Sequence, residues 1–324
     1  MSDNINVESE LYDIIIIGGG CAGLAAALYA KRYQLKTLVI AKELGGLITT
    51  THIVENYPGI LPMSGWDMMN IFLKQMEQLE VELREGEVTA IRRVERCADG
   101  SCSHTFELDA NGKILTAKSV VFATGTKHRE LGAPGEEMYR NKGVSYCATC
   151  DGALFKKKPL LVVGGGDSAA KEALLLSTYG SHVWVAARST LRAEPINLRR
   201  IDNNEKVDII APNEVVEILG DGKSVTGVTL KNEYNGSTHL EVQGVFIEIG
   251  HLPQNEIAVP LGVTMNAKKE ICIDRESKTN VPGFFAAGDC TDTGWKQAIV
   301  SASEGSQAAN SAYEYLTKQF VSPK

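Results

Sequence analysis

The chain has 324 residues, of which 44% are hydrophobic and 23% charged, and its formal net charge is −7. This composition is typical of a globular protein, and the length predicts about two domains of ~150 residues each. The acidic balance argues against a nucleic-acid partner, because neutralising phosphates requires a basic surface.

Two further features of the sequence bear on the compartment. The polar, acidic start at Met1–Asn4 lacks the basic and apolar regions of an export signal, and no apolar run approaches the ~20 residues of a membrane helix. The cysteines number seven, an odd count that argues against a secreted disulfide scaffold and for a reducing compartment. We therefore expect a cytoplasmic protein that has no membrane partner.

The first nucleotide-binding pattern follows a short β-branched run. Residues Tyr12–Ile17 predict a buried parallel strand, and they lead into Gly18–Gly23, a G-x-G-x-x-G before an Ala/Leu-rich helix. In this strand–turn–helix context the glycines permit a tight turn, close approach of a pyrophosphate and close helix packing, while the helix N-terminus faces the phosphates. We interpret Cys21 inside the turn as a small residue rather than a reactive thiol.

The chain between this pattern and its middle alternates strands and helices. A second strand is expected at Thr37–Ile40 and an amphipathic helix over 66–80, with an apolar stripe that packs in the core, formed by Trp66, Met69, Phe72, Met76 and Leu79. Residues 81–118 alternate apolar and polar side chains and predict a small antiparallel insertion with a turn around 98–103. The run Val120–Thr126 is expected to be a buried strand at which the chain leaves the first domain.

The stretch Ser145–Gly152 contains a C-x-x-C pair, Cys147 and Cys150, with the carboxylate of Asp151 directly after it. Such a pair can close a small disulfide ring, and its thiolate can be stabilised by a helix N-terminus or a nearby charge. The alternative is half of a zinc site, which needs four ligands. The chain has neither a second C-x-x-C nor a His pair at finger spacing, so the spacing favours a redox pair and no metal site.

A second nucleotide-binding pattern follows the cysteine pair. The strand Pro159–Val163 leads into Gly164–Ala169, a G-x-G-x-x-A before another Ala/Leu-rich helix. Arginines follow the next strand, at the place where the 2′-phosphate of NADP would be held. The alternative is an exposed basic loop. The four arginines are Arg188, Arg192, Arg199 and Arg200.

Near the end of the chain, the apolar run Val281–Ala287 closes on Gly288 and Asp289, where an aspartate commonly accepts sugar hydroxyls. A helix is expected from Gln297 to Leu316. The two glycine patterns imply two dinucleotides and two doubly wound domains. A hydride carries two electrons and a disulfide takes two, so a flavin that mediates between a nicotinamide and the cysteine pair fits this arrangement.

Nearly the whole chain resembles low-molecular-weight thioredoxin reductases. The matching stretches are IIIIGGGCAGLAAALYA, TTTHIVENYPG, ATGT, SYCATCDG, VVGGGDSAAKEA, VPGFFAAGDC and KQAIVSASEG, and C-A-T-C-D-G between the two glycine patterns is the most specific. The resemblance implies an α/β fold of two Rossmann-like three-layer (ββα) dinucleotide-binding domains, the second inserted in the first. It implies an FAD-binding domain in two parts, 1–126 and 253–324, and an NAD(P)-binding domain carrying the redox disulfide, 127–252.

The resemblance also implies the functional residues. Cys150 would face the flavin, Cys147 would attack the disulfide of thioredoxin or a thioredoxin-like protein, and Asp151 would be the acid/base. The expected FAD contacts are Gly18, Gly20, Ala22, Gly23, Gly45, Gly46, Leu47, Asn56, Val88, Ala123, Thr124, Gly125, Gly288, Asp289, Gln297 and Ala298. The expected nicotinamide dinucleotide contacts are Gly164, Gly166, Asp167, Ser168, Ala169, Arg188, Arg192 and Gly250. Members of the family are homodimers that rotate one domain against the other, here about hinges near Thr126 and Gly250.

Three departures from the family pattern leave the electron donor open. Ala186–Ser189 replaces His-Arg-Arg-Asp, Leu47 stands where a Gln is usual, and Lys296 stands where an Arg is usual. Each lost charged hydrogen bond costs ~1.5–3 kcal/mol, which weakens the preference for NADPH. NADPH is therefore the first expectation, with NADH or another donor as alternatives.

The leading expectation for function is electron transfer from NAD(P)H through FAD and the cysteine pair to thioredoxin. One alternative is a flavin-dependent dithiol oxidase with oxygen as acceptor, which would need no working nicotinamide site. Another is a nucleotide-binding redox sensor or scaffold, against which Asp151 and the intact cysteine pair argue.

Overall fold

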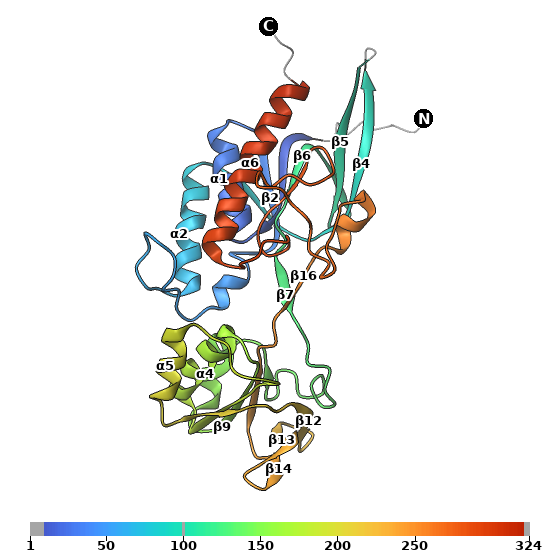
Figure 1. Ribbon diagram of the computed structural model, residues 1–324. Coiled ribbons are helices and arrows are strands. Elements are labelled where there is room, and N and C mark those ends of the chain that lie inside the picture. The colour runs from blue at the N-terminus through green and yellow to red at the C-terminus, as the bar shows by residue number, and fades with distance from the viewer. Residues whose placement is uncertain (1–9, 99–100, 321–324) are drawn as a thin grey trace. The chain divides into compact units, whose positions relative to one another are not determined.

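The computed structural model describes residues 10–98 and 101–320. It divides the chain into two compact units: unit 1 comprises 1–127 with 253–324, and unit 2 comprises 128–252 (Figure 1). The chain passes between them in β7 (Thr126–His128) and β16 (His251–Pro253), which pair with each other. None of the helices in the described ranges has the length and apolar character to cross a membrane.

Unit 1 is built on a mixed sheet of strand order β3-β2-β1-β6-β5-β4, with β17 also paired to β6. Strand β1 pairs in parallel with β2 and β6, whereas β4, β5 and β6 form an antiparallel meander. The strands are β1 (Leu11–Gly19), β2 (Thr37–Leu44), β3 (Glu82–Glu85), β4 (Val88–Ala98), β5 (Ser101–Ala110), β6 (Lys113–Phe122) and β17 (Phe284–Ala286). The helices are α1 (Cys21–Arg32), η1 (Leu47–Thr50), α2 (Gly65–Gln78), η3 (Glu256–Leu261) and α6 (Ala298–Phe320).

The isoleucine run of β1 supplies both faces of this sheet. Ile14 and Ile16 pack with the helices, while Ile15 and Ile17 pack in a second core cluster that includes side chains of β4 and β5. Because successive strand side chains alternate between faces, a strand covered on both sides must be apolar throughout. In Figure 1 the helices α1, α2 and α6 accordingly lie on one side of the parallel strands, with β4 and β5 on the other.

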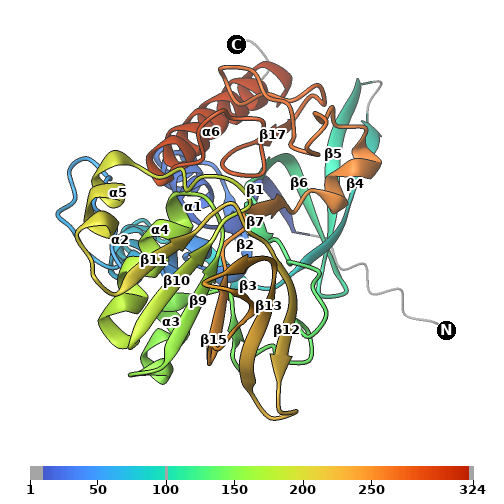
Figure 2. The same cartoon turned by 60° about the horizontal axis from the view of Figure 1, so that its bottom comes forward.

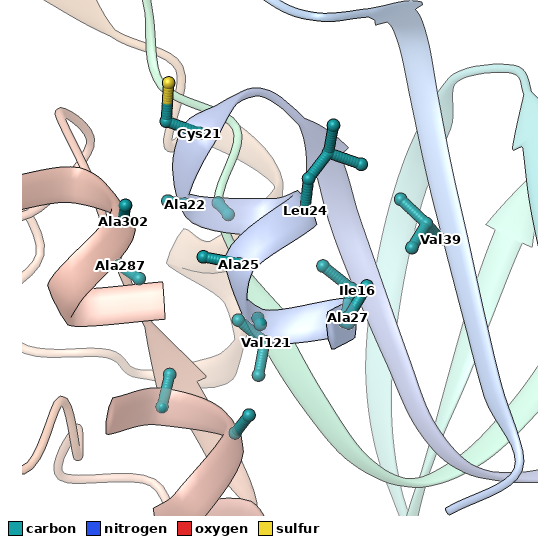
Figure 3. Packing of buried hydrophobic residues seen from close by; sticks show 14 of the residues in the cluster. Ile16, Cys21, Ala22, Leu24, Ala25, Ala27, Val39, Val121, Ala287 and Ala302 are labelled. Carbon is teal, nitrogen blue, oxygen red and sulfur yellow. The ribbon is translucent and has the colours of Figure 1, made fainter. Parts of the chain in front are cut away.

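Helix α1 approaches α6 through small residues. Figure 3 shows Ala22 and Ala25 of α1 alongside Ala302 of α6 and Ala287, all in one buried cluster. At Gly305 of α6 an added Cβ would lie 2.0 Å from the backbone oxygen of Ala22. The contact therefore requires glycine, and it fixes the start of α1 against the C-terminal helix.

Unit 2 has the same plan around a parallel five-stranded sheet of order β11-β10-β9-β15-β8. In Figure 2 the helices α4 and α5 lie on one side of β9 and β10, with β12 and β13 on the other. The strands are β8 (Val144–Ser145), β9 (Pro159–Val163), β10 (His182–Ala186), β11 (Val207–Ile210), β12 (Val215–Gly220), β13 (Val225–Tyr234), β14 (Ser237–Leu240) and β15 (Gly244–Ile247). The helices are α3 (Ala148–Asp151), η2 (Gly152–Phe155), α4 (Asp167–Tyr179) and α5 (Pro195–Asp202).

The expected α/β class with parallel sheets is confirmed, and several local expectations are corrected. Trp66 is 58% exposed, because the buried side of α2 is formed by Gly65, Met68, Met69 and Met76. Strand β3 pairs in parallel with β2, so the antiparallel segment begins only at β4. The turn expected around 98–103 includes residues 99–100, which lie outside the described ranges, and the last helix extends to Phe320 rather than Leu316.

Candidate functional site

A disulfide joins Cys147 to Cys150 at the start of the short helix α3, with the two Cα atoms 5.3 Å apart. Cys147 is half-buried and Cys150 is exposed. The segment follows β8 directly, so the pair lies at the carboxyl end of a parallel strand. The turn Gly164–Gly166 follows β9 in the same sheet, so both features belong to the edge at which open α/β sheets bind ligands.

Asp151 is held on the disulfide segment by a serine. The Ser145 hydroxyl donates to Asp151 Oδ2 at 2.7 Å, and its oxygen accepts from the Cys147 N–H at 3.1 Å. The Cys150 N–H points at Cys147 Sγ, 3.0 Å away. The carboxylate is thus linked to the Cys147 N–H through one hydroxyl group. Ser145 was not among the expected site residues, although it stands next to them in the sequence.

A second carboxylate reaches the segment from α4. Both oxygens of Glu172 accept from the Ala148 N–H, at 3.0 and 3.1 Å. Burial raises the pKa of Glu172 to about 7, although the hydrogen bond from the Ala148 N–H acts to lower this pKa. Burial, and then the charge of Glu172, raise the pKa of Glu248 to about 9. Neither residue was expected from the sequence, although Glu172 interrupts the apolar side of α4 between Ala169 and Ala173, which is an available signal.

The turn at the start of α4 has the shape of a phosphate cradle. An added Cβ at Gly164 would lie 2.2 Å from the Glu248 backbone oxygen, whereas one at Gly166 would meet nothing within 4 Å. No side chain caps the N-terminus of α4. The first-turn carboxylate of Asp167 is engaged elsewhere, accepting from the Glu194 N–H at 2.8 Å and pairing with Lys171 at 2.7 Å.

The remaining residues expected at this turn lie on or near it. Ser168 is exposed and Ala169 is fully buried. The side chains of Arg188 and Arg192, beyond β10, are exposed, and the Arg192 N–H donates to the Gly165 oxygen at 2.8 Å. Gly250, directly before β16, has a φ of +97°.

The first glycine pattern forms a similar turn in unit 1. Gly18, with a φ of +115°, would place a Cβ 2.0 Å from the Ala123 oxygen, and Gly23 would place one 1.9 Å from the Gly18 oxygen. At Gly20 a Cβ would come no closer than 3.9 Å to any atom, the nearest being Gly46 Cα. The first turn of α1 has no acidic residue, and no side chain caps it. The uncapped start of α1 therefore fits a pyrophosphate.

Hydrogen bonds in unit 1 join further expected residues that lie far apart in the sequence. The Asn56 amide donates to Gln297 Oε1 at 3.0 Å, across 241 positions. Asp289 Oδ1 accepts from the Ser301 hydroxyl at 3.1 Å, and burial raises the pKa of Asp289. The Gly288 N–H donates to Glu304 at 2.8 Å, a contact that no sequence pattern predicted.

The other residues expected around the first turn are distributed over several elements. Ala22 lies 3.0 Å from where a Cβ of Gly288 would be, and the Gly45 N–H donates to the Gly19 oxygen. Val88 is buried at the start of β4, in the second core cluster. Leu47 lies at the start of η1 and Ala298 at the start of α6. Thr124 and Gly125 lie just beyond the end of β6.

Comparison with known proteins agrees with this geometry. The model of the family described as "Pyridine nucleotide-disulphide oxidoreductase" matches residues 12–305. A thioredoxin reductase of Listeria innocua is 41% identical over 312 residues, 95% of this chain and 95% of the relative. An alkyl hydroperoxide reductase component of Xanthomonas campestris pv. phaseoli is 37% identical over 312 residues, 95% of this chain but 58% of that protein. The crystal structure of Lactococcus lactis thioredoxin reductase superposes with a TM-score of 0.88 at 37% identity, covering 95% of this chain and 99% of the other.

Proposed function

The chain belongs to the pyridine nucleotide-disulphide oxidoreductase family, and we propose that within this family it works as a thioredoxin reductase. It is an oxidoreductase that acts on a disulfide, and its family uses a flavin and a nicotinamide nucleotide. The observation that carries the proposal is the Cys147–Cys150 disulfide, directly followed by Asp151. The Asp151 carboxylate accepts a hydrogen bond from the Ser145 hydroxyl. The partner we propose is thioredoxin or a thioredoxin-like protein.

We propose that FAD binds at the turn Gly18–Gly23 and the nicotinamide dinucleotide at the turn Gly164–Ala169. The support is that both turns leave their helix N-termini free of side-chain caps and that Gly20 and Gly166 leave room above the backbone. A bound flavin supplies two-electron transfer between a nicotinamide and a disulfide. Asp289, with the neighbouring Gly288, would hold the sugar side of the flavin nucleotide.

The proposed chemistry of the chain itself is thiol–disulfide exchange. Two electrons and two protons reduce the disulfide to the thiols of Cys147 and Cys150. The Cys147 thiolate attacks one sulfur of the partner disulfide, forming a mixed disulfide and releasing the other partner sulfur as a thiolate. Cys150 then attacks the Cys147 sulfur, which re-forms the original pair and frees the second partner thiolate. Asp151 takes the proton from the attacking thiol and returns one to the leaving thiolate.

We propose NADPH as the donor, bound through Arg188 and Arg192, with a homodimer in the cytoplasm as the working form. The support is the position of both arginines beyond β10 and the bond from the Arg192 N–H to the turn. Loss of the family's other basic residues, at Ala186 and Ala187, favours NADH as the second candidate donor. A solution mass twice the 35.0 kDa of one chain tests the homodimer.

Steady-state reduction of purified thioredoxin by the flavin-loaded protein, with NADPH and NADH in separate reactions, tests this function. We expect Arg188→Ala and Arg192→Ala each to raise the KM for NADPH about 10- to 100-fold, because each removes a charged hydrogen bond, and to leave the KM for NADH unchanged. Arg275→Ala, at an exposed arginine of unit 1, is the matched control.

Two results contradict the proposal. Failure to reduce thioredoxin with either nucleotide removes the proposed partner. Oxygen consumption on addition of a dithiol, without nucleotide oxidation, points to a dithiol oxidase, the second candidate function, which the missing histidine and arginine at Ala186 and Ala187 favour.

A further inference from the structure

Unit 2 contains two carboxyl groups that the proposed reaction does not use. Glu172 projects from α4, and Glu248 follows β15, the strand between β9 and β8. Glu248 is 7% exposed, and within the described ranges no hydrogen bond or ion pair involves its carboxyl group. Charging a buried carboxyl group that has no partner costs free energy, and the charge of a second carboxyl group adds to that cost.

The geometry joins these carboxyls to the redox pair. Ala148 is fully buried, and its N–H is the first after Cys147, so the bond to Glu172 fixes the Cys147–Ala148 peptide. The nearly equal distances from the two Glu172 oxygens, 3.0 and 3.1 Å, show that the whole carboxylate faces this one donor. A charge held there is close enough to influence the ionisation of the neighbouring thiol.

The two carboxyls also influence each other. The negative charge of Glu172 acts on Glu248 and, with burial, favours the protonated form of Glu248. As the pH rises, Glu172 therefore ionises first, while Glu248 stays protonated.

We propose that Glu172 is a positioning residue of the redox pair: its carboxyl group holds the Cys147–Ala148 peptide, and its charge acts on the Cys147 thiol. The proposal rests on the proposed role of Cys147–Cys150 as the redox disulfide. A charged Glu172 opposes formation of a thiolate at Cys147, and a protonated Glu172 permits it. The protonation state of Glu172 thus sets how readily Cys147 of the reduced pair becomes a nucleophile.

Other charged groups on the elements packed against α4 have partners of their own or, like Asp202 of α5, are exposed. On α3, Asp151 accepts from Ser145, and on α4 itself Lys171 pairs with Asp167. The remaining groups with such partners are His182 of β10 with Asp208 of β11, Arg200 of α5 with Asn197, and Lys158 before β9 with the ring of Phe155. Glu248 is the group whose electrostatic coupling reaches Glu172.

Alkylation of the reduced thiols tests the proposal without nucleotide or thioredoxin. The flavin-loaded full-length protein is reduced with dithiothreitol without oxygen, and its alkylation rate with iodoacetamide is measured from pH 5 to 10, with the modified cysteine identified by mass spectrometry. Glu172→Gln keeps an oxygen for the Ala148 N–H but has no charge. We expect it to lower the pH midpoint of Cys147 alkylation by about one unit, the effect of removing a nearby like charge.

Two further variants are expected to leave the midpoint unchanged. Glu248→Gln replaces a carboxyl group that stays protonated at the pH at which Glu172 ionises, so the charge near Cys147 does not change. Glu217→Gln, an exposed carboxylate of β12, is the control for net charge. A midpoint of Glu172→Gln equal to that of Glu217→Gln would overturn the effect of the Glu172 charge on Cys147.

The positioning role has a separate readout. Glu172→Ala removes the acceptor as well as the charge, so it should lower the thermal unfolding midpoint more than Glu172→Gln does. Equal midpoints in these two variants would overturn the positioning role. Because no donor or protein partner takes part, both results stand apart from whether thioredoxin is the substrate.

Discussion

Asp151 and Glu172 each place a carboxylate on the disulfide segment, in different surroundings. Asp151 is half-buried and accepts from a hydroxyl, which can pass a proton on. Glu172 accepts from a peptide N–H, which keeps its proton, and burial raises the pKa of its carboxyl group. The two groups therefore suit different tasks, proton exchange for Asp151 and control of position and charge for Glu172.

Replacing Asp151 by Asn should slow the reaction while leaving the disulfide in place. The amide keeps the size of the side chain and can still accept from Ser145, but it does not take up a proton. We expect thioredoxin reduction by the flavin-loaded protein to fall by about 10²-fold or more, the usual range for a removed general acid–base. The measurement is the turnover rate at saturating nucleotide and thioredoxin.

Ser145→Ala is the matched control for this substitution. It leaves the Asp151 carboxylate and removes only the hydroxyl that orients it, so its effect should be clearly smaller than that of Asp151→Asn. A turnover rate for Asp151→Asn within a few-fold of the unmodified protein contradicts the assignment of Asp151 as the acid/base.

At this scale, the residues that could be predicted are those adjacent in the sequence. Cys147, Cys150 and Asp151 lie within five positions, so spacing alone brings them together. Glu172 meets Ala148 across 24 positions, and Glu248 joins them only because β15 lies between β9 and β8. Strand order is a tertiary property that a local pattern does not encode, which is why these two carboxyls were missed.

Among the elements, the strands β7 and β16 carry a pair of histidines where the chain crosses between the units. The rings of His128 and His251 are 4.9 Å apart, and His128 also lies 6.0 Å from Tyr146. Burial, and then the charge of His251, lower the pKa of His128 to about 4, and burial lowers the pKa of His251. Both rings are therefore neutral in the folded protein over a pH range in which exposed histidines become charged.

These histidines should make the protein less stable in acid. Their pKa is lower in the folded state than the ~6.5 of the unfolded chain, so the unfolded chain binds more protons and the free energy of unfolding falls as the pH drops from ~6.5 toward 4. His128→Phe keeps a ring and removes the proton site. We expect its thermal unfolding midpoint to match that of the unmodified protein at pH 7 and to fall less between pH 6.5 and 4.

His239→Phe, at an exposed position of β14, is the control for this comparison and should follow the unmodified protein. The raised pKa of Glu172 and Glu248 acts with the opposite sign, since their contribution is complete below ~4.5 and is lost as the pH rises. That contribution is common to all three proteins and does not affect their differences. An acid profile of His128→Phe identical to the control would contradict the effect of the histidine pair.

The elements that sequence reasoning recovered are those with an unambiguous pattern. The isoleucine run of β1 could only be a strand covered on both faces, and each glycine pattern fixed a strand, a turn and a helix. Trp66 was assigned to the buried side of α2 because a spacing of three or four residues defines a face but not its limits. Strand β3 has only four residues, too short to show on its own which neighbour it would pair with.

In the whole molecule, the plan of one unit is repeated in the other. Each has parallel strands with helices on one face and antiparallel strands on the other, and each has two core clusters. The α/β class could be predicted because two glycine patterns, each between a strand and a helix, require this topology twice. The antiparallel strands β12–β14 could not be assigned in this way, because nothing in their sequence indicates which sheet they cover.

Unit 2 should therefore fold when it is separated from the rest of the chain. Both of its core clusters lie wholly within 128–252, and its length is within the ~100–150 residues typical of one domain. Its ends already lie side by side, since the Arg129 N–H donates to the Gly250 oxygen at 2.9 Å. We expect the fragment 128–252 to unfold cooperatively on heating, followed by circular dichroism, and to keep Cys147–Cys150 closed in a thiol assay. A shorter fragment that ends at Leu240 is the control: it lacks β15, the strand between β9 and β8, and should not fold. A gradual thermal transition in the fragment 128–252 would show that unit 2 depends on unit 1 for its core.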